Sequence, residues 1–294
     1  MKKLLRIGTR NSKLALWQAN HIKDFLLSHF NDLEIVLKEI VTTGDTNSTE
    51  NISELNGKNS FVKEIEDSLL INEIDVAVHS FKDMPVDIPE GLEIIATSNR
   101  EDPRDVLISS NHKKISEINP LSLIGTGSAR RAEQLNLIRK DLEIIPIRGN
   151  VDTRVKKVFN GDIDGVVLAN AGIKRLGLDS YVSEIFPVDV IVPSPLQGFL
   201  AIEAREDSDF IKLFESFSSE ESVLISNYER QFLKDLNLGC EYPAGFCMQA
   251  ENNKFTFNYF LKGSENEIKR KEIFDYSDLS KQYSKMIDKL RPII

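Results

Sequence analysis

Residues 4–30, LLRIGTRNSKLALWQANHIKDFLLSHF, indicate the fold class of the first part of the chain. The apolar start, residues 4–9, has the length and composition of a strand. Ser12 then stands where a helix N-cap is expected, and apolar residues recur at helical spacing as far as Phe30. We expect the inward-facing side chains of this helix to be Leu16, Trp17, Ile22, Phe25 and Leu26. A strand that passes directly into an amphipathic helix is the repeating unit of an α/β protein.

The same alternation continues over the first two thirds of the chain. Apolar runs with the length of strands lie at residues 34–41, 74–79, 123–124, 143–147 and 165–169. Helices are expected at residues 61–72 and after Ser128, Asn150 and Gly172. Residues 42–60 are polar and long for a structureless connection, which is typical of a lid, a binding loop or a disordered segment. The sequence therefore predicts an α/β sheet protein.

Two interruptions predict where domains meet. The stretch REDPR at residues 100–104 breaks the alternation, and prolines cluster near residues 187–195. From about residue 218 the pattern changes to a helix, an alternating strand and a final helix. We expect a first domain of residues 1–99 and 196–217, interrupted by a second domain of residues 100–195. Residues 218–294 then form a small α+β domain.

The composition excludes several classes of protein. Of 294 residues, 41% are hydrophobic, which is typical of globular and not of disordered chains. The formal net charge of -9 argues against general nucleic-acid binding but permits an anionic small ligand. No apolar run is long enough to cross a bilayer. Two cysteines are too few for a disulfide framework, and the four histidines lie far apart in sequence. We expect a cytoplasmic, metal-free enzyme or binding protein.

Arginines are concentrated where predicted strands end and helices begin. Ligands of open α/β sheets bind at such junctions. An arginine fork binds a carboxylate or phosphate through two hydrogen bonds, and helix N-termini add N–H donors. The cations at these junctions are Arg10, Arg130, Arg131, Arg148, Arg154, Lys174 and Arg175. Each one alone is compatible with an ordinary surface role, but their number along one expected rim favours a cleft for a polyanion.

The segment GTGSARR at residues 125–131 has two glycines of a dinucleotide fingerprint and lacks the third. This pattern favours an anion cradle over a nucleotide site.

The segment HSFKDMP at residues 79–85 closes an apolar strand with polar and charged groups. Asp83 is suited to general acid–base chemistry at the rim, with Lys82 beside it to bind an anion. Capping of the turn before Pro85 is an equally good explanation of Asp83. His79 is better explained as a hydrogen-bonded structural histidine than as a ligand.

Cys240 lies in a turn, between a glycine and the sequence Glu241-Tyr242-Pro243. A thiol flanked in this way can be exposed and nucleophilic, whereas most lone cysteines are small buried hydrophobes. Position alone favours the buried state for Cys240, and Cys247, within an apolar segment, is expected to be buried.

Together these motifs resemble the porphobilinogen deaminase (hydroxymethylbilane synthase) family. The similar segments stand in the family's order over nearly the full chain. They are residues 8–12 with 14–19, 57–58 with 61–64, 79–86, 100–105, 125–131, 148–154, 171–177, 197–198, and 239–240 with Pro243. The most specific are HSFKDMP and RGNVDTR.

The resemblance implies two doubly wound α/β domains around a cleft, similar to type-2 periplasmic binding proteins, and a third domain that carries a cysteine. It implies a transferase of haem and porphyrin biosynthesis that joins four porphobilinogen units head to tail with loss of ammonia. The chain grows on a dipyrromethane cofactor, made by the enzyme from its own substrate, and hydrolysis then releases hydroxymethylbilane. The resemblance also implies a cytoplasmic monomer without a metal, a membrane partner or a nucleic-acid partner.

The resemblance further implies roles for single residues. Cys240 matches the cysteine that holds the cofactor through a thioether. Asp83 matches the catalytic aspartate, which assists deamination, stabilises the azafulvenium cation and takes the proton from the coupled carbon. The cofactor-binding positions are Cys240, Lys82, Asp83, Ser12, Ser128, Arg130 and Arg131. The substrate-binding positions are Arg10, Arg148, Arg154, Arg175, Gln18, Lys58, Ser80 and Asn150. Because each pyrrole carries an acetate and a propionate, a growing chain needs many fixed cations.

Several residues depart from the family's pattern: Glu54, Asn59, Ser60, Gly127, Phe199 and Leu238. Gly127 removes one possible hydroxyl contact, and Phe199 is large where a small residue is usual. We therefore expect activity with altered translocation of the growing chain. The strongest alternative is a cytoplasmic anion-binding protein or sensor of the same fold. Such a protein shares the arginine rim but has no use for Cys240 together with Asp83.

Overall fold

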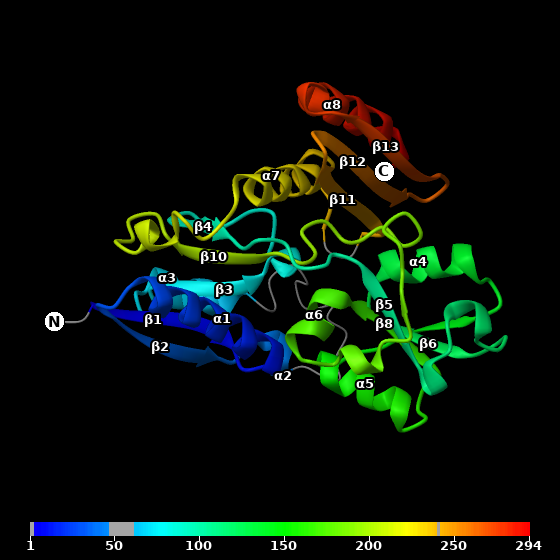
Figure 1. Cartoon of the computed structure of the whole chain (residues 1–294), viewed down its shortest axis with the longest axis horizontal. Coiled ribbons are helices and arrows are strands. Elements are labelled where there is room, and N and C mark those ends of the chain that lie inside the picture. The colour runs from blue at the N-terminus through cyan, green and yellow to red at the C-terminus, as the bar shows by residue number, and fades with distance from the viewer. Residues whose placement is uncertain (1–2, 47–61, 240–241) are drawn as a thin grey trace. The chain divides into compact units, whose positions relative to one another are not determined.

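The computed structural model describes residues 3–46, 62–239 and 242–294 (Figure 1). Lys58 and Cys240 lie outside the described residues, as do Glu54, Asn59 and Ser60. The described chain divides into two compact units. Unit 1 comprises Met1–Arg100 and Phe199–Val223, and unit 2 comprises Glu101–Gly198 and Leu224–Ile294. The three-domain division with borders near residues 99, 195 and 217 stays a prediction.

Unit 1 is built on a five-stranded sheet with the order β2-β1-β3-β10-β4 (Figure 1). Its strands are β1 (Lys3–Arg10), β2 (Leu33–Ile40), β3 (Val76–Ser80), β4 (Leu92–Thr97) and β10 (Leu200–Arg205). β1 runs parallel to β2 and β3, whereas β10 is antiparallel to its neighbours β3 and β4. Its other elements are α1 (Lys13–His29), α2 (Thr43–Thr46), α3 (Lys63–Leu70) and the 3₁₀ turns η1 (Phe81–Asp83) and η5 (Ile211–Phe214).

The pleat of β3 explains why helices cover both faces of this sheet. Val76 and Val78 share one buried cluster with Ile22 of α1. Ala77, which points to the opposite face, packs in a second cluster with Ile65 of α3. The sheet of unit 1 is therefore doubly wound.

Helix α1 begins as predicted, because the Ser12 hydroxyl accepts a hydrogen bond from the Ala15 N–H at 3.2 Å. The prediction that Trp17 faces inward is wrong. Its side chain is 38% exposed, and its ring stacks on His21 with 5.1 Å between ring centroids. The buried stripe of α1 is made by Ala15, Gln18, Ala19, Ile22 and Leu26. At 3.6 residues per turn, position 17 lies outside this stripe.

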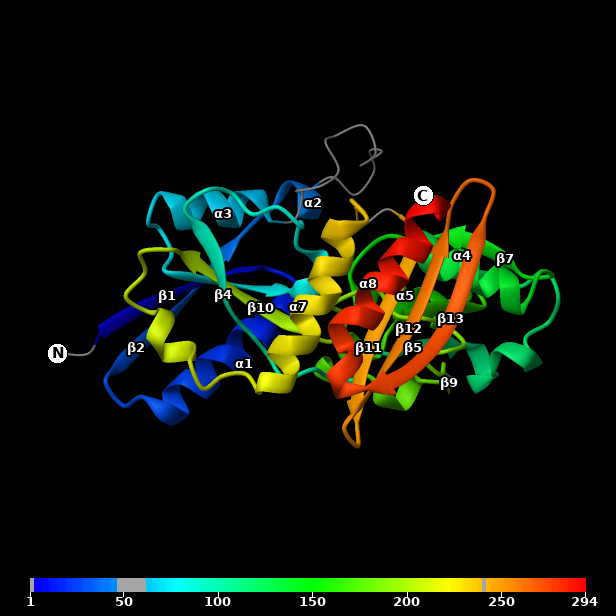
Figure 2. The ribbon, with the colours of Figure 1, turned by 90° about the horizontal axis from the view of Figure 1, so that it is seen from above.

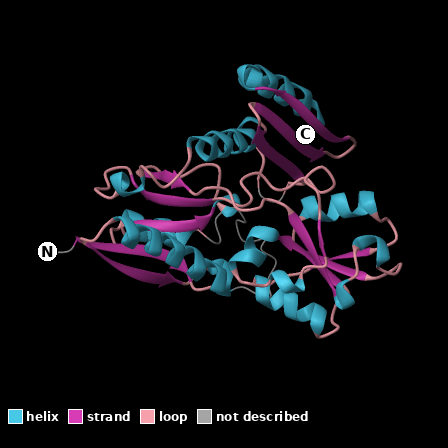
Figure 3. Ribbon diagram, viewed as in Figure 1, coloured by secondary structure: helices cyan, strands magenta, loops and turns pink. Residues whose placement is uncertain are grey.

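Unit 2 contains a second five-stranded sheet, with the order β7-β6-β8-β5-β9. Its strands are β5 (Asp105–Ser109), β6 (Leu123–Thr126), β7 (Glu143–Pro146), β8 (Gly165–Ala169) and β9 (Glu184–Ile185). β6 is parallel to β7 and β8, and β5 is antiparallel to β8 and β9. The associated helices are α4 (Ala129–Ile138), α5 (Val151–Phe159) and α6 (Asn170–Arg175). Val166 packs against α5 and its neighbour Val167 lies in the cluster of α4, so this sheet is also doubly wound (Figure 3).

The last part of unit 2 is a three-stranded antiparallel sheet with the order β11-β12-β13. It comprises β11 (Ala244–Glu251), β12 (Lys254–Lys262), β13 (Glu267–Asp275) and α8 (Leu279–Leu290). Helix α7 (Glu220–Asp235) belongs to this unit from Leu224 onward. Figure 2 shows α8 lying along this sheet. Phe246 of β11 stacks on Phe232 of α7 at 4.7 Å between centroids. Cys247 of β11 is fully buried, as predicted. The remaining 3₁₀ turns are η2 (Ser110–His112), η3 (Ile115–Glu117), η4 (Asp179–Tyr181), η6 (Tyr276–Asp278) and η7 (Arg291–Ile293).

The α/β fold class is confirmed, with two doubly wound sheets and a small α+β part. Strands β4, β5 and β10 were not predicted from the sequence, although β5 and β10 each pair with two antiparallel neighbours. Among the described residues, no helix combines the length and the apolar character that a membrane span requires.

Candidate functional site

In unit 1, predicted site residues gather at the carboxyl ends of β1 and β3. These strands are parallel neighbours, with Gly8 opposite Ala77, so their carboxyl ends meet at one edge of the sheet. Arg10 ends β1 and Ser80 ends β3, and both are half-buried. The Gln18 amide, 2% exposed, donates a hydrogen bond to the Ser80 hydroxyl at 2.8 Å. This contact explains why a polar residue occupies the buried face of α1.

Asp83 and Lys82 lie on the short turn η1 that follows β3. Phe81 and Met84 are buried on either side of them and anchor the turn. The Met84 N–H donates to the Phe81 carbonyl at 3.2 Å, so the turn closes through its own backbone. Asp83 is exposed and Lys82 is half-buried. The turn is thus closed without the carboxylate, so capping does not account for Asp83, and its acid–base role stays a prediction.

A second group of titratable side chains lies inside unit 1. His79 is buried, and its Nε2 lies 3.1 Å from Oε2 of the buried Glu203 on β10, as a structural histidine should. Glu66 of α3 is 2% exposed. Burial first, and then the charge of Glu203, raise the pKa of Glu66 to about 7, although His79 acts in the opposite direction. Oε1 of Glu66 and Oε1 of Glu203 are buried without a hydrogen-bond partner among the described residues.

In unit 2, the first turn of α4 carries two buried arginines. Arg130 and Arg131 are 3% and 5% exposed, and both pair with the fully buried carboxylate of Asp105 at the start of β5. Arg130 Nη1 lies 2.7 Å from Oδ2, and Arg131 Nη2 lies 2.8 Å from Oδ1. Gln197 completes the group by donating to Asp105 at 2.9 Å. The sequence predicted arginines on an open rim and not their pairing with this carboxylate, because the apolar run that Asp105 begins was not recognised as a strand.

Asp105 stays ionised in this setting. Burial alone disfavours the charged carboxylate, but the two guanidinium groups hold the pKa of Asp105 far below its usual range. Two positive charges and one negative charge thus lie together in the interior, which leaves a net positive charge at the start of α4.

The N-termini of α4 and α5 lie at the same edge of the second sheet, because they follow the parallel strands β6 and β7. Their N-cap residues, Ser128 and Asn150, make no side-chain capping hydrogen bond. Arg148 is exposed just before α5, and Arg154 Nε donates to the Gly149 carbonyl at 2.7 Å. Helix N-termini whose N–H groups are not capped by side chains favour anions.

Arg175, at the end of α6, is 9% exposed, and its Nη2 donates to the Gly198 carbonyl at 2.7 Å. Burial lowers the pKa of Arg175 to about 10, although Glu101 opposes the shift. Lys174, its neighbour, pairs with Glu101 at 2.9 Å. Of the predicted arginines in unit 2, Arg148 is therefore exposed, whereas Arg130, Arg131 and Arg175 are built into the protein interior.

Gly127 has a packing explanation. A Cβ atom at this position would lie 2.9 Å from the carbonyl oxygen of Ile147, which is closer than such atoms approach in proteins. A serine, which is common at this position in the family that the sequence resembles, therefore does not fit here unless the backbone at residue 147 moves.

We expect Gly127→Ser to destabilise the protein by roughly 1–3 kcal/mol, because the added side chain overpacks this junction. Urea denaturation compared with wild type measures the effect. Ala129→Ser, at an exposed position two residues away, is the control and should stay within about 0.5 kcal/mol of wild type. Equal urea midpoints for Gly127→Ser and wild type would show that the backbone at residue 147 moves without a loss of stability.

The other described departures from the family pattern are buried. Phe199 is 1% exposed, its carbonyl accepts the Phe81 N–H at 3.1 Å, and the Arg100 guanidinium lies 4.9 Å from its ring centroid. Phe199 thus supports the turn that carries Asp83. Leu238 is 4% exposed and follows the end of α7. Gly239 and Tyr242, which flank the two undescribed residues, are joined by a 3.2 Å hydrogen bond from the Tyr242 N–H.

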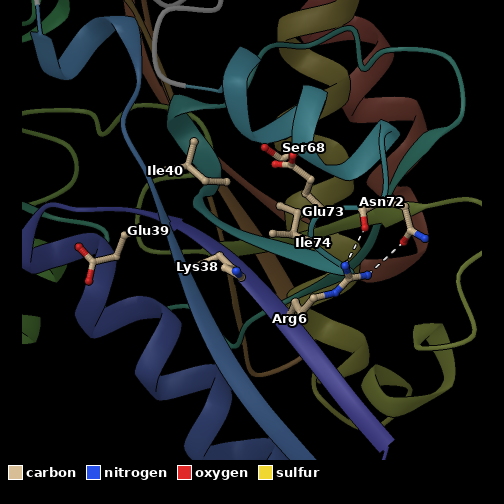
Figure 4. Close-up of a pocket in the computed structure, with 8 residues that line it drawn as sticks. All are labelled: Arg6, Lys38, Glu39, Ile40, Ser68, Asn72, Glu73 and Ile74. Atoms are coloured by element: carbon tan, nitrogen blue, oxygen red, sulfur yellow. Dashed lines mark hydrogen bonds between the residues drawn. The ribbon is translucent and has the colours of Figure 1, made fainter.

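A cavity of about 510 Å³ lies in unit 1 (Figure 4). Its lining residues are Arg6, Lys38, Glu39, Ile40, Ser68, Asn72, Glu73 and Ile74. Arg6 is already bound to Asp75 at 2.7 Å and to the Asn72 carbonyl at 2.7 Å. Two carboxylates offset the two cations of the lining, so this cavity does not suit a polyanion.

A metal centre is not seen in residues 3–46, 62–239 and 242–294, where no three His, Cys, Asp or Glu side chains are grouped to hold an ion.

Three comparisons with known proteins bear on this site. Residues 5–212 match the family model described as porphobilinogen deaminase, dipyromethane cofactor binding domain. The chain is 46% identical over 240 residues to the porphobilinogen deaminase of Syntrophomonas wolfei subsp. wolfei (strain DSM 2245B / Goettingen), covering 81% of this chain and 78% of that relative. It is 38% identical over 294 residues to the porphobilinogen deaminase of Lawsonia intracellularis (strain PHE/MN1-00), covering 98% of this chain and 95% of the relative.

Among solved structures, the chain is similar to the periplasmic aliphatic sulphonate binding protein of Escherichia coli. The TM-score is 0.41 at 14% identity, and the match covers 80% of this chain and 70% of that one.

The family model covers more than half of the chain, and the two relatives are matched over most of their own length. The segments quoted from the sequence, HSFKDMP and RGNVDTR among them, lie within the matched residues. This chain belongs to the porphobilinogen deaminase family.

Proposed function

We propose that this chain catalyses the reaction for which its family is named, with Asp83 as the catalytic carboxylate and Cys240 as the point of cofactor attachment. The transferase joins four porphobilinogen units head to tail with loss of ammonia and releases hydroxymethylbilane by hydrolysis. The observation that carries the residue assignment is Asp83, exposed on a turn that Phe81 and Met84 anchor, inside the segment matched by the family model.

The cofactor of the family is a dipyrromethane, which supplies the pyrrole end from which the chain grows. Its carboxylates need cations and N–H donors, and unit 2 offers both at the starts of α4 and α5. We assign the binding of the cofactor to Arg130, Arg131 and the N-cap Ser128 at the start of α4, and to Lys82 and Ser12. The N-termini of α4 and α5, which carry no side-chain cap, and the net positive charge beside Asp105 support this fit.

The substrate's own acetate and propionate groups would be bound by a second set of polar residues. We assign to this set Arg10, Arg148, Arg154, Arg175, Gln18, Ser80 and Asn150, together with Lys58. Asp83 would assist the departure of ammonia, stabilise the cation left on the substrate and accept the proton released on coupling. A carboxylate acts most strongly on such a cation when water is excluded from the site.

Intact-protein mass spectrometry tests this proposal. The purified enzyme is expected to weigh two pyrrole units more than its sequence, because the cofactor is covalent. Cys240→Ser removes the sulfur and should show the sequence mass and no consumption of porphobilinogen. Cys247→Ser is the matched control, because this thiol is buried in β11 and has no assigned role. Wild-type protein at the sequence mass that remains inert with porphobilinogen would instead favour the anion-binding alternative.

We also infer that the protein acts in the cytoplasm as a monomer of three domains, as its family does. Sedimentation of the purified protein should give a mass near 33.3 kDa.

A further inference from the structure

We infer that Asp105 is a positioning residue, which holds Arg130 and Arg131 in place to receive the carboxylates of the cofactor. The inference rests on the proposed function, because it assigns these two arginines to the dipyrromethane. Asp105 does not itself touch the ligand in this view and acts only through the arginines.

The first support is the geometry of the carboxylate. Asp105 is fully buried, and both of its oxygens are used. Oδ2 accepts from Arg130 at 2.7 Å, and Oδ1 accepts from Arg131 Nε at 3.0 Å. Gln197 donates to Oδ1 at 2.9 Å and also donates to the Pro103 carbonyl at 2.6 Å. Gln197 thus holds the carboxylate in addition to the two arginines. A carboxylate that is fixed in this way also fixes the two guanidinium groups.

The second support is the charge balance. Arg130 and Arg131 are consecutive on α4 and nearly fully buried, so their like charges repel each other in a medium that screens poorly. Asp105 lies between them and offsets one of the two charges. Without it, each guanidinium would turn to a different acceptor, and the pair would lose its arrangement.

The third support is the difference between the two arginines. Arg131 donates from Nε, Nη1 and Nη2 to Asp105, to the Val167 carbonyl and to Gln197. Arg130 donates from Nη1 to Asp105 and to the Val192 carbonyl at 2.6 Å, while its buried Nε has no partner among the described residues. Arg131 therefore serves as the fixed member, whereas Arg130 is held by fewer hydrogen bonds among the described residues.

The test is cofactor acquisition by Asp105→Asn, which removes the charge but keeps the shape. Cofactor-free protein is incubated with porphobilinogen, and intact mass gives the fraction of chains that carry two added pyrroles over time. Groups that orient metal-binding side chains matter by about 10–100-fold, and we expect an effect of the same order here, so that acquisition slows at least about tenfold. The control is Glu133→Gln, the same chemical change on α4 at a carboxylate that pairs with Lys262 at 2.6 Å and is partly exposed. It should stay within about twofold of wild type.

A further variant, Asp105→Glu, separates positioning from space filling. Asp105→Glu keeps the charge in a site with no exposed surface, whereas Asp105→Asn keeps the volume. Positioning by charge predicts faster acquisition by the glutamate variant than by the asparagine variant. A purely structural role predicts the reverse order, because the longer side chain overpacks the site.

The inference is overturned if folded Asp105→Asn acquires the cofactor at the wild-type rate. It is also overturned if Asp105→Asn acquires the cofactor faster than Asp105→Glu does. Where Asp105→Asn does not fold, Gln197→Ala replaces it, because this variant keeps all three charges and removes the amide that donates to the carboxylate of Asp105 and accepts from Arg131. We expect a severalfold slowing for it, and an unchanged rate overturns the inference. Wild-type protein that carries no cofactor and consumes no substrate would reject the proposed function itself, which is a separate outcome.

Discussion

Asp83→Asn is expected to lower turnover of porphobilinogen by roughly 100–1,000-fold, the cost typical of losing one group that stabilises charge in a transition state. Asparagine keeps the size of the side chain but cannot offset the positive charge that forms when ammonia leaves, and it cannot accept the proton released on coupling. Because Asp83 is exposed and its turn is closed by backbone hydrogen bonds, the fold should change in stability by less than about 0.5 kcal/mol.

The measurement is the turnover number and KM, expressed per molecule that carries the cofactor as judged by intact mass. Asp87→Asn is the matched control, since it makes the same change at another exposed aspartate four residues further along. KM for Asp83→Asn should change much less than the turnover number, because the arginines still bind the carboxylates of the substrate. A turnover number within about threefold of wild type would remove Asp83 from the proposed chemistry.

Glu66→Gln should change how the stability of the protein depends on pH. The pKa of Glu66 is raised from 4.5 to about 7, so the folded state keeps a proton that the unfolded chain releases. Its contribution to stability is complete below about pH 4.5 and is lost as the pH rises through 7. Between pH 5 and pH 8, wild type should therefore lose roughly 2–3 kcal/mol relative to Glu66→Gln, which has no proton to release.

Urea midpoints of the two proteins at pH 5 and pH 8 measure this difference. Glu73→Gln is the control, because it changes an exposed glutamate just beyond α3. Its urea midpoints should equal those of wild type at both pH values. The physical cause is the burial of Glu66 near Glu203, with His79 opposing it, so the effect should shrink when Glu203 is also neutralised. If the urea midpoints of wild type and Glu66→Gln change equally between pH 5 and pH 8, Glu66 keeps an ordinary pKa.

The parts of the fold that depend on local pattern could be predicted from the sequence. Ser12 caps α1 as expected, because capping involves only neighbouring backbone groups. Trp17 was assigned to the wrong face, because a large apolar side chain counted for more than its position in the helical period. β10 was not predicted as a strand, and its antiparallel place between β3 and β4 depends on where the chain returns after residue 198.

The candidate site shows the same limit. The junction arginines and Asp83 could be found because strand ends and motifs mark them in the sequence. Asp105 could not be paired with Arg131 in the same way, since 26 positions separate them and β5 was not recognised. A single carboxylate at the start of the apolar run DVLIS was the available signal, because a buried charge requires a partner.

The position of β10 has a consequence for synthesis of the protein. This strand lies between β3 and β4, so the first sheet has a gap until residue 205 has left the ribosome. The whole of Glu101–Gly198 emerges before that gap can close, and the edges of β3 and β4 stay unpaired meanwhile. The N-terminal part of the chain therefore completes its folding after the segment that interrupts it, in contrast to the usual order in which the first domain to emerge folds first.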